Sequence, residues 1–340
     1  MISRRLSAHL PGLLLCVTIG LLANFLSRAA NWSSGILLID PFTCAIVIGI
    51  VVKSFLKVRA IFGSGIRFSS IVLLEIAVFF LGFSLDFGVF QGSDIVFVGG
   101  VLALVGLMLV VSFTICRAVG LPEHLAVLVA CGNSICGNAA IAAVAPAVQA
   151  RNEDVVAAVT FSSILGVLFV VSLPLLAPIM GLDAFQFGTF AGLTVYAVPQ
   201  VVAATAPVSF LSTQVGTAVK LVRVLMLVPA VLVAPLLLRN RDSPRRRASS
   251  PRFHLVKILP WFIPGFLVAA WLNNTGFVPA KASSLSSDIS RALFLIAMSG
   301  LGLSVDLRRL LSIGPKLVIS ICLSLAMLSL ASFFFVKSLS

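Results

Sequence analysis

One stretch of the chain combines residue types that could bind a small solute inside a membrane. It runs from Cys131 to Ala140 and contains two glycines, two asparagines and a serine, within the apolar run 125–148. Glycine weakens a helix, and amide groups are costly in hydrocarbon unless they find partners. Transporters place such broken helices near the membrane midplane, where they bind substrate or ions. We therefore predict that Asn133, Ser134 and Asn138 bind substrate or an ion; close helix packing is the alternative.

A second group of polar residues lies in the apolar run 186–207. Tyr196 and Gln200 are four residues apart and therefore share one face of a helix. Pro199 frees the backbone carbonyl one turn earlier, which could coordinate a cation or accept a hydrogen bond from substrate. We predict that Tyr196 and Gln200 belong to the binding site. The alternative is a proline kink with an interfacial tyrosine.

Three charged residues fall inside apolar runs, where charges are rare and usually functional or paired. Lys220 and Arg223 lie three residues apart on one helix face, and Glu75 lies near the middle of an earlier run. One hypothesis is that the two cations present a positive site to an anion while Glu75 titrates during transport. The other is a purely structural ion pair between Glu75 and either cation. Asp288 and Arg291 are expected to be helix-end residues.

The composition is that of an integral membrane protein. The chain has 340 residues, of which 60% are hydrophobic and only 10% are charged, against about a quarter charged in soluble domains. The net charge of +13 resides in short loops between apolar runs, which indicates membrane orientation rather than nucleic-acid binding. No catalytic triad, phosphate loop or metal-ligand spacing occurs. We therefore expect a protein that is not an enzyme and has no cofactor or metal, apart from a coupling Na⁺ or H⁺.

The predicted fold is all-α, with about eleven transmembrane helices. The predicted spans are 10–27, 36–52, 66–86, 94–116, 123–148, 154–179, 186–207, 214–238, 256–273, 287–305 and 314–336. The fifth and seventh have polar centres. The first could pass for a signal peptide, but we interpret it as a retained helix because it is long for that role.

The basic residues give the predicted orientation. With the N-terminus in the cytoplasm, 17 basic residues face the cytoplasm and 5 face the opposite side, as the positive-inside rule requires. An odd number of spans then places the C-terminus outside. The basic, Ser/Pro-rich segment 239–256 is interpreted as a cytoplasmic loop that fixes topology; binding of anionic lipid or a regulatory role is the alternative.

Several motifs resemble the YeiH-type family of bacterial inner-membrane proteins, which carries the label of sulfate exporter. The motifs are Gly132–Pro146, Leu74–Val78, Gln200–Ala204 and Lys220–Leu225. The chain departs from the family at Tyr196–Pro199, where the resemblance predicts His-Glu/Asp-Val-Ala. The family is similar to the bile acid/arsenite/riboflavin transporter group. That similarity implies two inverted five-helix repeats with crossing broken helices, preceded by one extra N-terminal helix.

These observations predict a single membrane transporter domain. Its parts are an extra helix at 1–30, a first repeat at 36–179 and a second repeat at 186–336. A five-span offset would pair the fifth span with the tenth, where Ser299–Gly302 could weaken the helix. The predicted function is secondary transport, in the export direction, of a small anion such as sulfate or a related sulfur oxyanion, by alternating access. The alternatives are a passive ion channel, a carrier of organic or amino acids coupled to Na⁺ or H⁺, and an intramembrane enzyme or structural subunit.

The expected partners are membrane lipid and a small anionic solute, without nucleic acid; a homo-oligomer is left open. The resemblance and the positive-inside asymmetry together imply the inner membrane of a bacterium.

Overall fold

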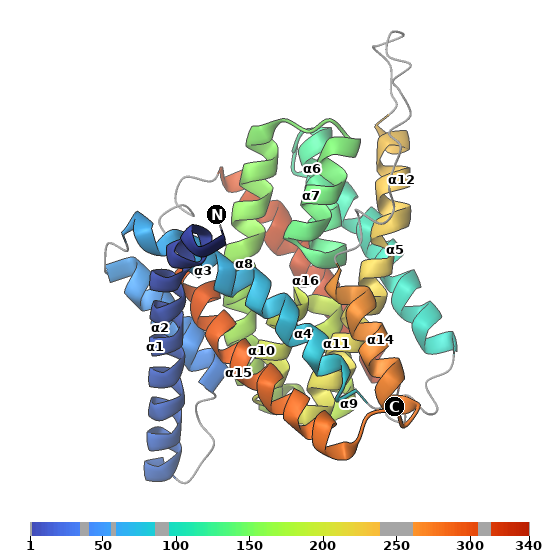
Figure 1. Cartoon of the computed structure of the whole chain (residues 1–340). Coiled ribbons are helices and arrows are strands. Elements are labelled where there is room, and N and C mark those ends of the chain that lie inside the picture. Colours follow the sequence, from blue (N-terminus) through green and yellow to red (C-terminus); the bar gives the residue numbers. More distant parts are fainter. Residues whose placement is uncertain are drawn as a thin grey trace.

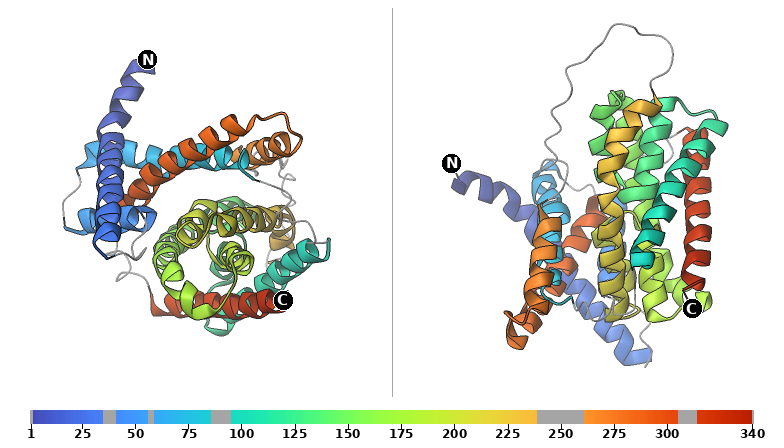
Figure 2. Two further views of the ribbon diagram at one scale, coloured as in Figure 1. Left: turned by 90° about the horizontal axis from the view of Figure 1, so that it is seen from below. Right: turned by 90° about the vertical axis from the view of Figure 1, so that its right-hand side faces the viewer.

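The computed structural model describes residues 2–34, 41–55, 59–85, 95–238, 261–304 and 314–339. Within these residues every regular element is a helix, and no strand is present. The all-helical membrane fold predicted from composition is therefore confirmed. The helices (Figure 1) form two groups that lie side by side, as both views of Figure 2 show.

The first group, which we call the panel group, is a flat layer of helices (Figure 2). Two of its helices touch at Gly302 because glycine has no side chain. A Cβ on Gly302 would collide with the Ile46 carbonyl. A π-helical turn, Ser69–Leu73, joins α3 to α4. The group consists of α1 (Ile2–Ser34), α2 (Pro41–Phe55), α3 (Gly63–Phe68), α4 (Leu74–Gly82), α14 (Phe262–Asn274) and α15 (Ala280–Ser304).

The second group, which we call the bundle group, contains most of the buried apolar side chains. It touches the panel group chiefly through α10, which contacts α2, α4 and α15, and through α8, which contacts α2. The group consists of α5 (Ile95–Ala118), α6 (Glu123–Cys131), α7 (Asn138–Ala147), α8 (Asn152–Met180), α9 (Ala184–Thr194), α10 (Val198–Thr205), α11 (Phe210–Leu225), α12 (Leu227–Leu237) and α16 (Pro315–Lys337).

The predicted fifth span does not cross the molecule. It is interrupted by a π-helical turn, Gly132–Cys136, which separates α6 from α7. His124 Nδ1, at the start of α6, lies 2.8 Å from the carbonyl oxygen of Val148, just after the end of α7. The two ends of the segment therefore lie together, and α6 and α7 form a helical hairpin with its tip at the break (Figure 1).

The first half of the predicted seventh span, α9, runs parallel to α11. At the start of both helices, the Ser212 hydroxyl donates to the Ala184 carbonyl at 2.7 Å. Towards the end of α9, a Cβ on Gly192 would come within 2.9 Å of Val219. Contacts thus advance along both helices in the same direction, which fixes their parallel arrangement.

The second half, α10, runs antiparallel to α11. Val201, in its first turn, packs against Gly216 in the middle of α11. Thr205, its last residue, donates to the Thr213 hydroxyl near the start of α11, at 3.3 Å. Because α9 and α10 run in opposite directions, they form a second hairpin. The hairpins enter from opposite ends of the bundle (Figure 1).

The number of crossing segments is therefore smaller than predicted. Two of the eleven predicted spans are hairpins, so nine of them remain candidates for crossing the membrane. The 11 residues of α9 extend only about 16 Å, roughly half the hydrocarbon thickness. Six described helices are long and apolar enough to cross a membrane, namely His9–Ala29, Gly63–Gly82, Val96–Ala118, Asn152–Met180, Phe210–Pro235 and Pro315–Lys337.

The predicted tenth span contains no break in its described part. α15 is one helix from Ala280 to Ser304 and continues through the Ser299–Gly302 cluster. The glycines there serve close packing, since Gly300 lies against Ser69 and Ser70 of the π-helical turn. The pairing of breaks in spans five and ten is thus wrong; the second break lies in span seven.

The helix-end prediction for Asp288 and Arg291 is also wrong. α15 begins at Ala280, well before the predicted start of the span, so both residues lie within the helix. At the N-terminus a single helix, α1, covers the predicted first span and includes Pro11. The predicted cytoplasmic loop 239–256 lies outside the described residues.

Candidate functional site at the hairpin tips

The tip of the first hairpin is formed by the asparagine- and glycine-containing segment. Asn133 and Ser134 are buried within the π-helical turn. π-Helical turns are rare and occur frequently at functional sites. Gly137 ends the turn with φ +65° and ψ −127°, a conformation that residues with a side chain rarely adopt. It therefore allows the chain to reverse and begin α7 at Asn138, which is exposed.

The tip of the second hairpin is a short extended segment between α9 and α10. Val195 has φ −68° and ψ 147°, and Ala197 has φ −116° and ψ 149°. Gln200 holds the start of α10, because its Oε1 accepts from the Ala197 amide at 3.2 Å. Its amide group lies against Gly166 of α8, where a Cβ would come within 2.7 Å.

The two tips touch each other. The Tyr196 hydroxyl donates to Asn133 Oδ1 at 2.9 Å. A Cβ on Gly137 would lie 3.1 Å from Tyr196 Cβ, so the glycine also makes room for the tyrosine. Residues 63 positions apart in the chain are thereby brought into one buried junction, as the sequence predicts for these two clusters.

Lys220, on α11, connects the two tips through their backbones. Its Nζ donates to the Ile135 carbonyl and to the Val195 carbonyl, each at 2.7 Å. Val195 O is the carbonyl that Pro199 was predicted to free. It does accept a hydrogen bond, and the donor is a cation of the protein itself.

Arg223, one turn further along α11, makes the same kind of connection with more donors. Its Nε donates to the Ser134 carbonyl at 3.0 Å, and Nη2 donates to the Asn133 carbonyl at 3.0 Å. Nη1 donates to carbonyls of the other tip, at 3.0 Å to Gly192 and also to Leu193. The planar guanidinium suits this role because its donors diverge in a fixed fork.

The junction contains two basic side chains that pair with no described carboxylate. Lys220 and Arg223 are completely buried, and neither forms an ion pair with a described residue. Each helix C-terminus that they cap contributes about −0.5 charge, and the N-termini of α7 and α10 contribute about +0.5 each. The dipole contributions cancel, so the helix ends supply no net counter-charge to these two basic side chains.

Glu75 does not belong to this junction. It lies on α4 in the panel group, and its Oε2 accepts from the Trp261 indole at 2.7 Å. The hypothesis of an ion pair between Glu75 and Lys220 or Arg223 is therefore wrong. Trp261 could not be predicted as its partner, because residues 186 positions apart leave no local pattern in the sequence.

The other predicted site residues lie at the two tips or bond to them, namely Asn133, Ser134, Tyr196, Gln200, Lys220 and Arg223. Asn138 follows the first tip directly as the first residue of α7, but it is exposed rather than buried in the junction. The backbone carbonyls of Gly192 and Leu193 escaped prediction, since every residue has a carbonyl and only a helix break exposes it. The Asn133 Nδ2 group is buried without a hydrogen-bond partner among the described residues. An unpaired buried donor suits a site that receives a further acceptor.

Comparison with known proteins finds relatives along nearly the whole chain. A family model described as Conserved hypothetical protein 698 matches residues 11–321. A UPF0324 membrane protein of Agrobacterium fabrum is 42% identical over 97% of this chain and 93% of its own length. A UPF0324 membrane protein of Bradyrhizobium diazoefficiens is 42% identical over 95% and 91%, and one of Brucella suis is 45% identical over 93% and 92%. No solved structure matches the chain.

Proposed function

The chain belongs to the family of Conserved hypothetical protein 698, with UPF0324 membrane proteins as relatives, and from this premise we propose that it is a secondary transporter of a small anion. One observation carries the proposal. Lys220 and Arg223 are buried where two helix breaks meet, without a carboxylate partner among the described residues. Buried charge is costly unless it is compensated. A bound anion would supply the missing compensation.

Asn133 is the side chain best placed to contact that anion. Its carbonyl lies at the Arg223 guanidinium, and its side-chain Nδ2 has a donor to spare. Ser134 and Asn138 flank it in the same tip, and Tyr196 fixes its orientation through Oδ1. We assign Lys220 and Arg223 a double role: they hold the tips together and supply the positive field.

The arrangement of the hairpins supports alternating access. The segment 123–180 contains a hairpin followed by a long helix, and the segment 184–237 repeats this order from the opposite end of the bundle. Corresponding tip residues are 60 positions apart: Gly132 matches Gly192, and Ser134 matches Thr194. Inverted repeats around a midplane site are the usual basis of two symmetry-related states, one open to each side.

The contact between the two groups of helices suits such a change. The panel group meets the bundle group chiefly along α10 and α8. Interfaces of limited extent within one chain generally permit relative movement of the parts. The proposed movement shifts the panel group against the bundle group and leaves the hairpin junction intact.

Sulfate is the first substrate to test, because the YeiH-type resemblance supports a sulfur oxyanion. We place the protein in the inner membrane with the N-terminus in the cytoplasm, on the strength of the positive-inside asymmetry. Export is the direction that the resemblance supports. No appended catalytic machinery and no cofactor belong to this proposal, and Na⁺ or H⁺ is the coupling ion.

The test is counterflow in liposomes that contain the purified full-length protein. Vesicles loaded with unlabelled sulfate should accumulate external labelled sulfate in a saturable, one-for-one exchange. Asn133→Asp keeps an acceptor for Tyr196 but adds a carboxylate beside the two cations, so it should abolish exchange of anions. Glu75→Gln is the matched control: it also exchanges an acid and an amide within a membrane helix, but lies outside the junction, so exchange should persist.

Two outcomes would overturn the proposal. The first is absence of counterflow for sulfate, methanesulfonate and small carboxylates alike. The second is unitary current without saturation or exchange, which would identify a channel. A thermal unfolding scan separates loss of fold from loss of site, because Asn133→Asp should unfold at or above the temperature of the wild-type protein.

A further inference from the structure

A cavity of about 570 Å³ lies between the panel group and the bundle group. Helices α1, α2, α4 and α15 form its panel side, and α10 and α11 form its bundle side. Its volume falls within the range of about 300–1,000 Å³ that is typical of small-molecule sites. A sulfate ion would occupy only a small part of it. The cavity is separate from the hairpin junction, since none of the residues at the two tips lines it.

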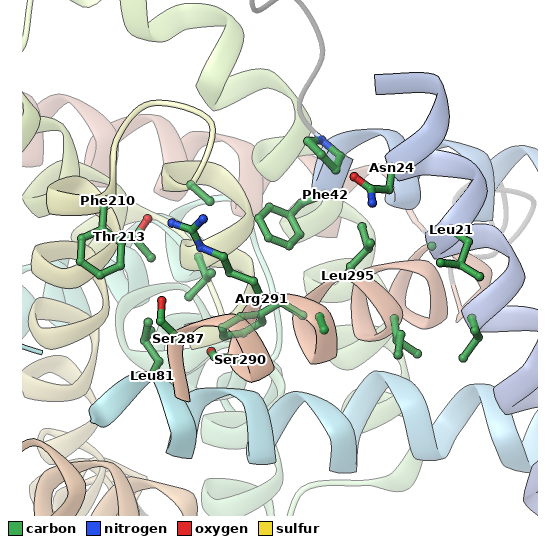
Figure 3. A pocket seen from close by; sticks show the side chains of 18 of the residues that line it. Leu21, Asn24, Phe42, Leu81, Phe210, Thr213, Ser287, Ser290, Arg291 and Leu295 are labelled. Carbon is green, nitrogen blue, oxygen red and sulfur yellow. The ribbon is translucent and has the colours of Figure 1, made fainter. Parts of the chain in front are cut away.

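The charged residues of the lining are both cationic. Arg28 of α1 and Arg291 of α15 line the cavity, and no described lining residue is acidic. Asp288 lies three residues before Arg291 on the same helix, a spacing that permits an ion pair, but none forms. The Arg291 side chain instead extends towards Phe210 and Thr213 across the cavity (Figure 3).

The start of α11 adds to the positive character of this end of the cavity. The Arg291 guanidinium carbon lies 6.0 Å from the centre of the Phe210 ring. Phe210 and Thr213 belong to the first turn of α11, where the helix dipole is positive. The Ser287 hydroxyl lines the cavity one turn before Arg291. An anionic group placed here would meet a guanidinium, a helix N-terminus and a hydroxyl.

Most of the remaining lining is apolar, with Asn24 and Ser290 as polar members beside Arg28. Phe42 of α2, Leu295 of α15 and Val202 of α10 face the cavity beyond the arginine (Figure 3 labels Phe42 and Leu295). Such walls gain nothing from a fully hydrated inorganic ion, whereas they favour burial of a hydrocarbon or aromatic part of a ligand. The guanidinium of Arg291 and the apolar walls beyond it suit a ligand that has an anionic group and an apolar body.

We infer that this cavity is a second binding site, which takes an organic anion with an apolar body, such as a sulfonate or carboxylate, with Arg291 as its principal anion-binding residue and Arg28 as an additional cation. This inference rests on the proposed transport function, because it identifies organic anions as the class of solute that the protein transports. Thr213 lines the cavity and lies seven residues before Lys220 on α11, which corresponds to about 10 Å along the helix. The cavity and the hairpin junction are thus both lined by α11, at positions about two turns apart.

The test is direct binding to the full-length protein in nanodiscs of neutral phosphatidylcholine, by calorimetric titration. Three probes separate the two parts of the ligand: benzenesulfonate has both, sulfate has only the charge, and benzyl alcohol has only the apolar ring. Benzenesulfonate should bind at least about tenfold more tightly than either of the other two. Arg291→Gln should weaken its binding about tenfold or more, with unchanged thermal unfolding.

Lys281→Gln is the matched control, because Lys281 is an exposed cation on the same helix outside the cavity lining; it should leave binding unchanged. Equal binding of sulfate and benzenesulfonate, or full binding by Arg291→Gln, would overturn the inference. So would complete displacement of benzenesulfonate by phosphatidylglycerol in the nanodisc, since the cavity would then be a lipid site. Sulfate counterflow that persists alongside any of these results would leave the proposed anion transport standing.

Discussion

Arg223 donates hydrogen bonds to carbonyls of both hairpin tips while it is completely buried. Replacement by methionine keeps the length and apolar volume but leaves these carbonyls without a donor. Each unsatisfied buried group costs about 1–3 kcal/mol, so Arg223→Met should lower the free energy of unfolding by about 3 kcal/mol or more. Denaturant unfolding in detergent measures the loss. Arg223→Lys keeps the charge but cannot reach both tips. Its free energy of unfolding should therefore lie between that of the wild-type protein and that of Arg223→Met.

The control for this prediction is Arg117→Met. Arg117 pairs with Glu123 at 3.2 Å, but both side chains are more than 40% exposed. Exposed pairs contribute about 0–1 kcal/mol, so this variant should be nearly as stable as the wild-type protein. Equal stability of the Arg117 and Arg223 variants would refute the bridging role of Arg223.

The sequence predicted which residues gather at this site better than it predicted their partners. Lys220 and Arg223 stood out because charge inside an apolar run must face the protein interior. Their acceptors are backbone carbonyls from segments about 25 to 90 residues away. No side-chain type indicates such an acceptor in the sequence. Pro199 lies in the first turn of α10, where an amide has no helical acceptor in any case, so the helix break rather than the proline frees the Val195 carbonyl.

At the scale of elements, Gly137 decides whether the first hairpin can close. Its φ of +65° and ψ of −127° suit glycine alone, and a Cβ would also lie 3.1 Å from Tyr196 Cβ. Gly137→Ala should therefore cost about 1–3 kcal/mol of stability and move the tip away from its partner. Thermal unfolding of the purified protein measures the first effect, and loss of anion-dependent stabilisation measures the second.

Gly181→Ala is the matched control for that variant. Gly181 also has a positive φ, +57°, but nothing lies within 4 Å of the Cβ position. It should lose only the conformational part, about 1 kcal/mol, and keep its response to anions. If the two alanine variants behave alike, the contact between Gly137 and Tyr196 has no part in shaping the site.

The two hairpins could not be predicted from the sequence. The run 123–148 has 26 residues, enough for one crossing of a bilayer or for two short helices that return. Composition is the same in both cases, and Gly-Asn at the centre suits a broken span as well as a hairpin tip. The choice depends on contacts between the ends, such as that of His124 with Val148, which no periodicity reveals.

For the whole molecule, replacing two crossings by two hairpins changes the sides of two loops, the one before α8 and the one after it, and only the first of them contains a basic residue. Arg151 follows the first hairpin and therefore returns to the side of Arg117. Moving Arg151 changes the count of basic residues from 17 on the cytoplasmic side and 5 on the opposite side to 18 and 4. The hairpin arrangement thus satisfies the positive-inside rule better than the eleven-span arrangement, which was predicted from the lengths of the apolar runs.

This reassignment can be tested with three single cysteines at exposed positions near loops. Glu123 lies on the cytoplasmic side and Val208 on the opposite side in both arrangements, whereas Glu153 changes sides between them. The background carries Cys322→Ala, because Cys322 is the only exposed cysteine of the six. An impermeant maleimide applied to spheroplasts should label Val208→Cys but neither of the other two.

In inverted vesicles the pattern should reverse, with Glu123→Cys and Glu153→Cys both labelled. If Glu153→Cys is labelled together with Val208→Cys in spheroplasts, the fifth span crosses the membrane after all. The two tips could not then enter from opposite ends as hairpins, and the inverted units on which the transport proposal relies would fail with them. The side of Glu153 therefore tests the architecture independently of any substrate, because labelling requires neither binding nor transport.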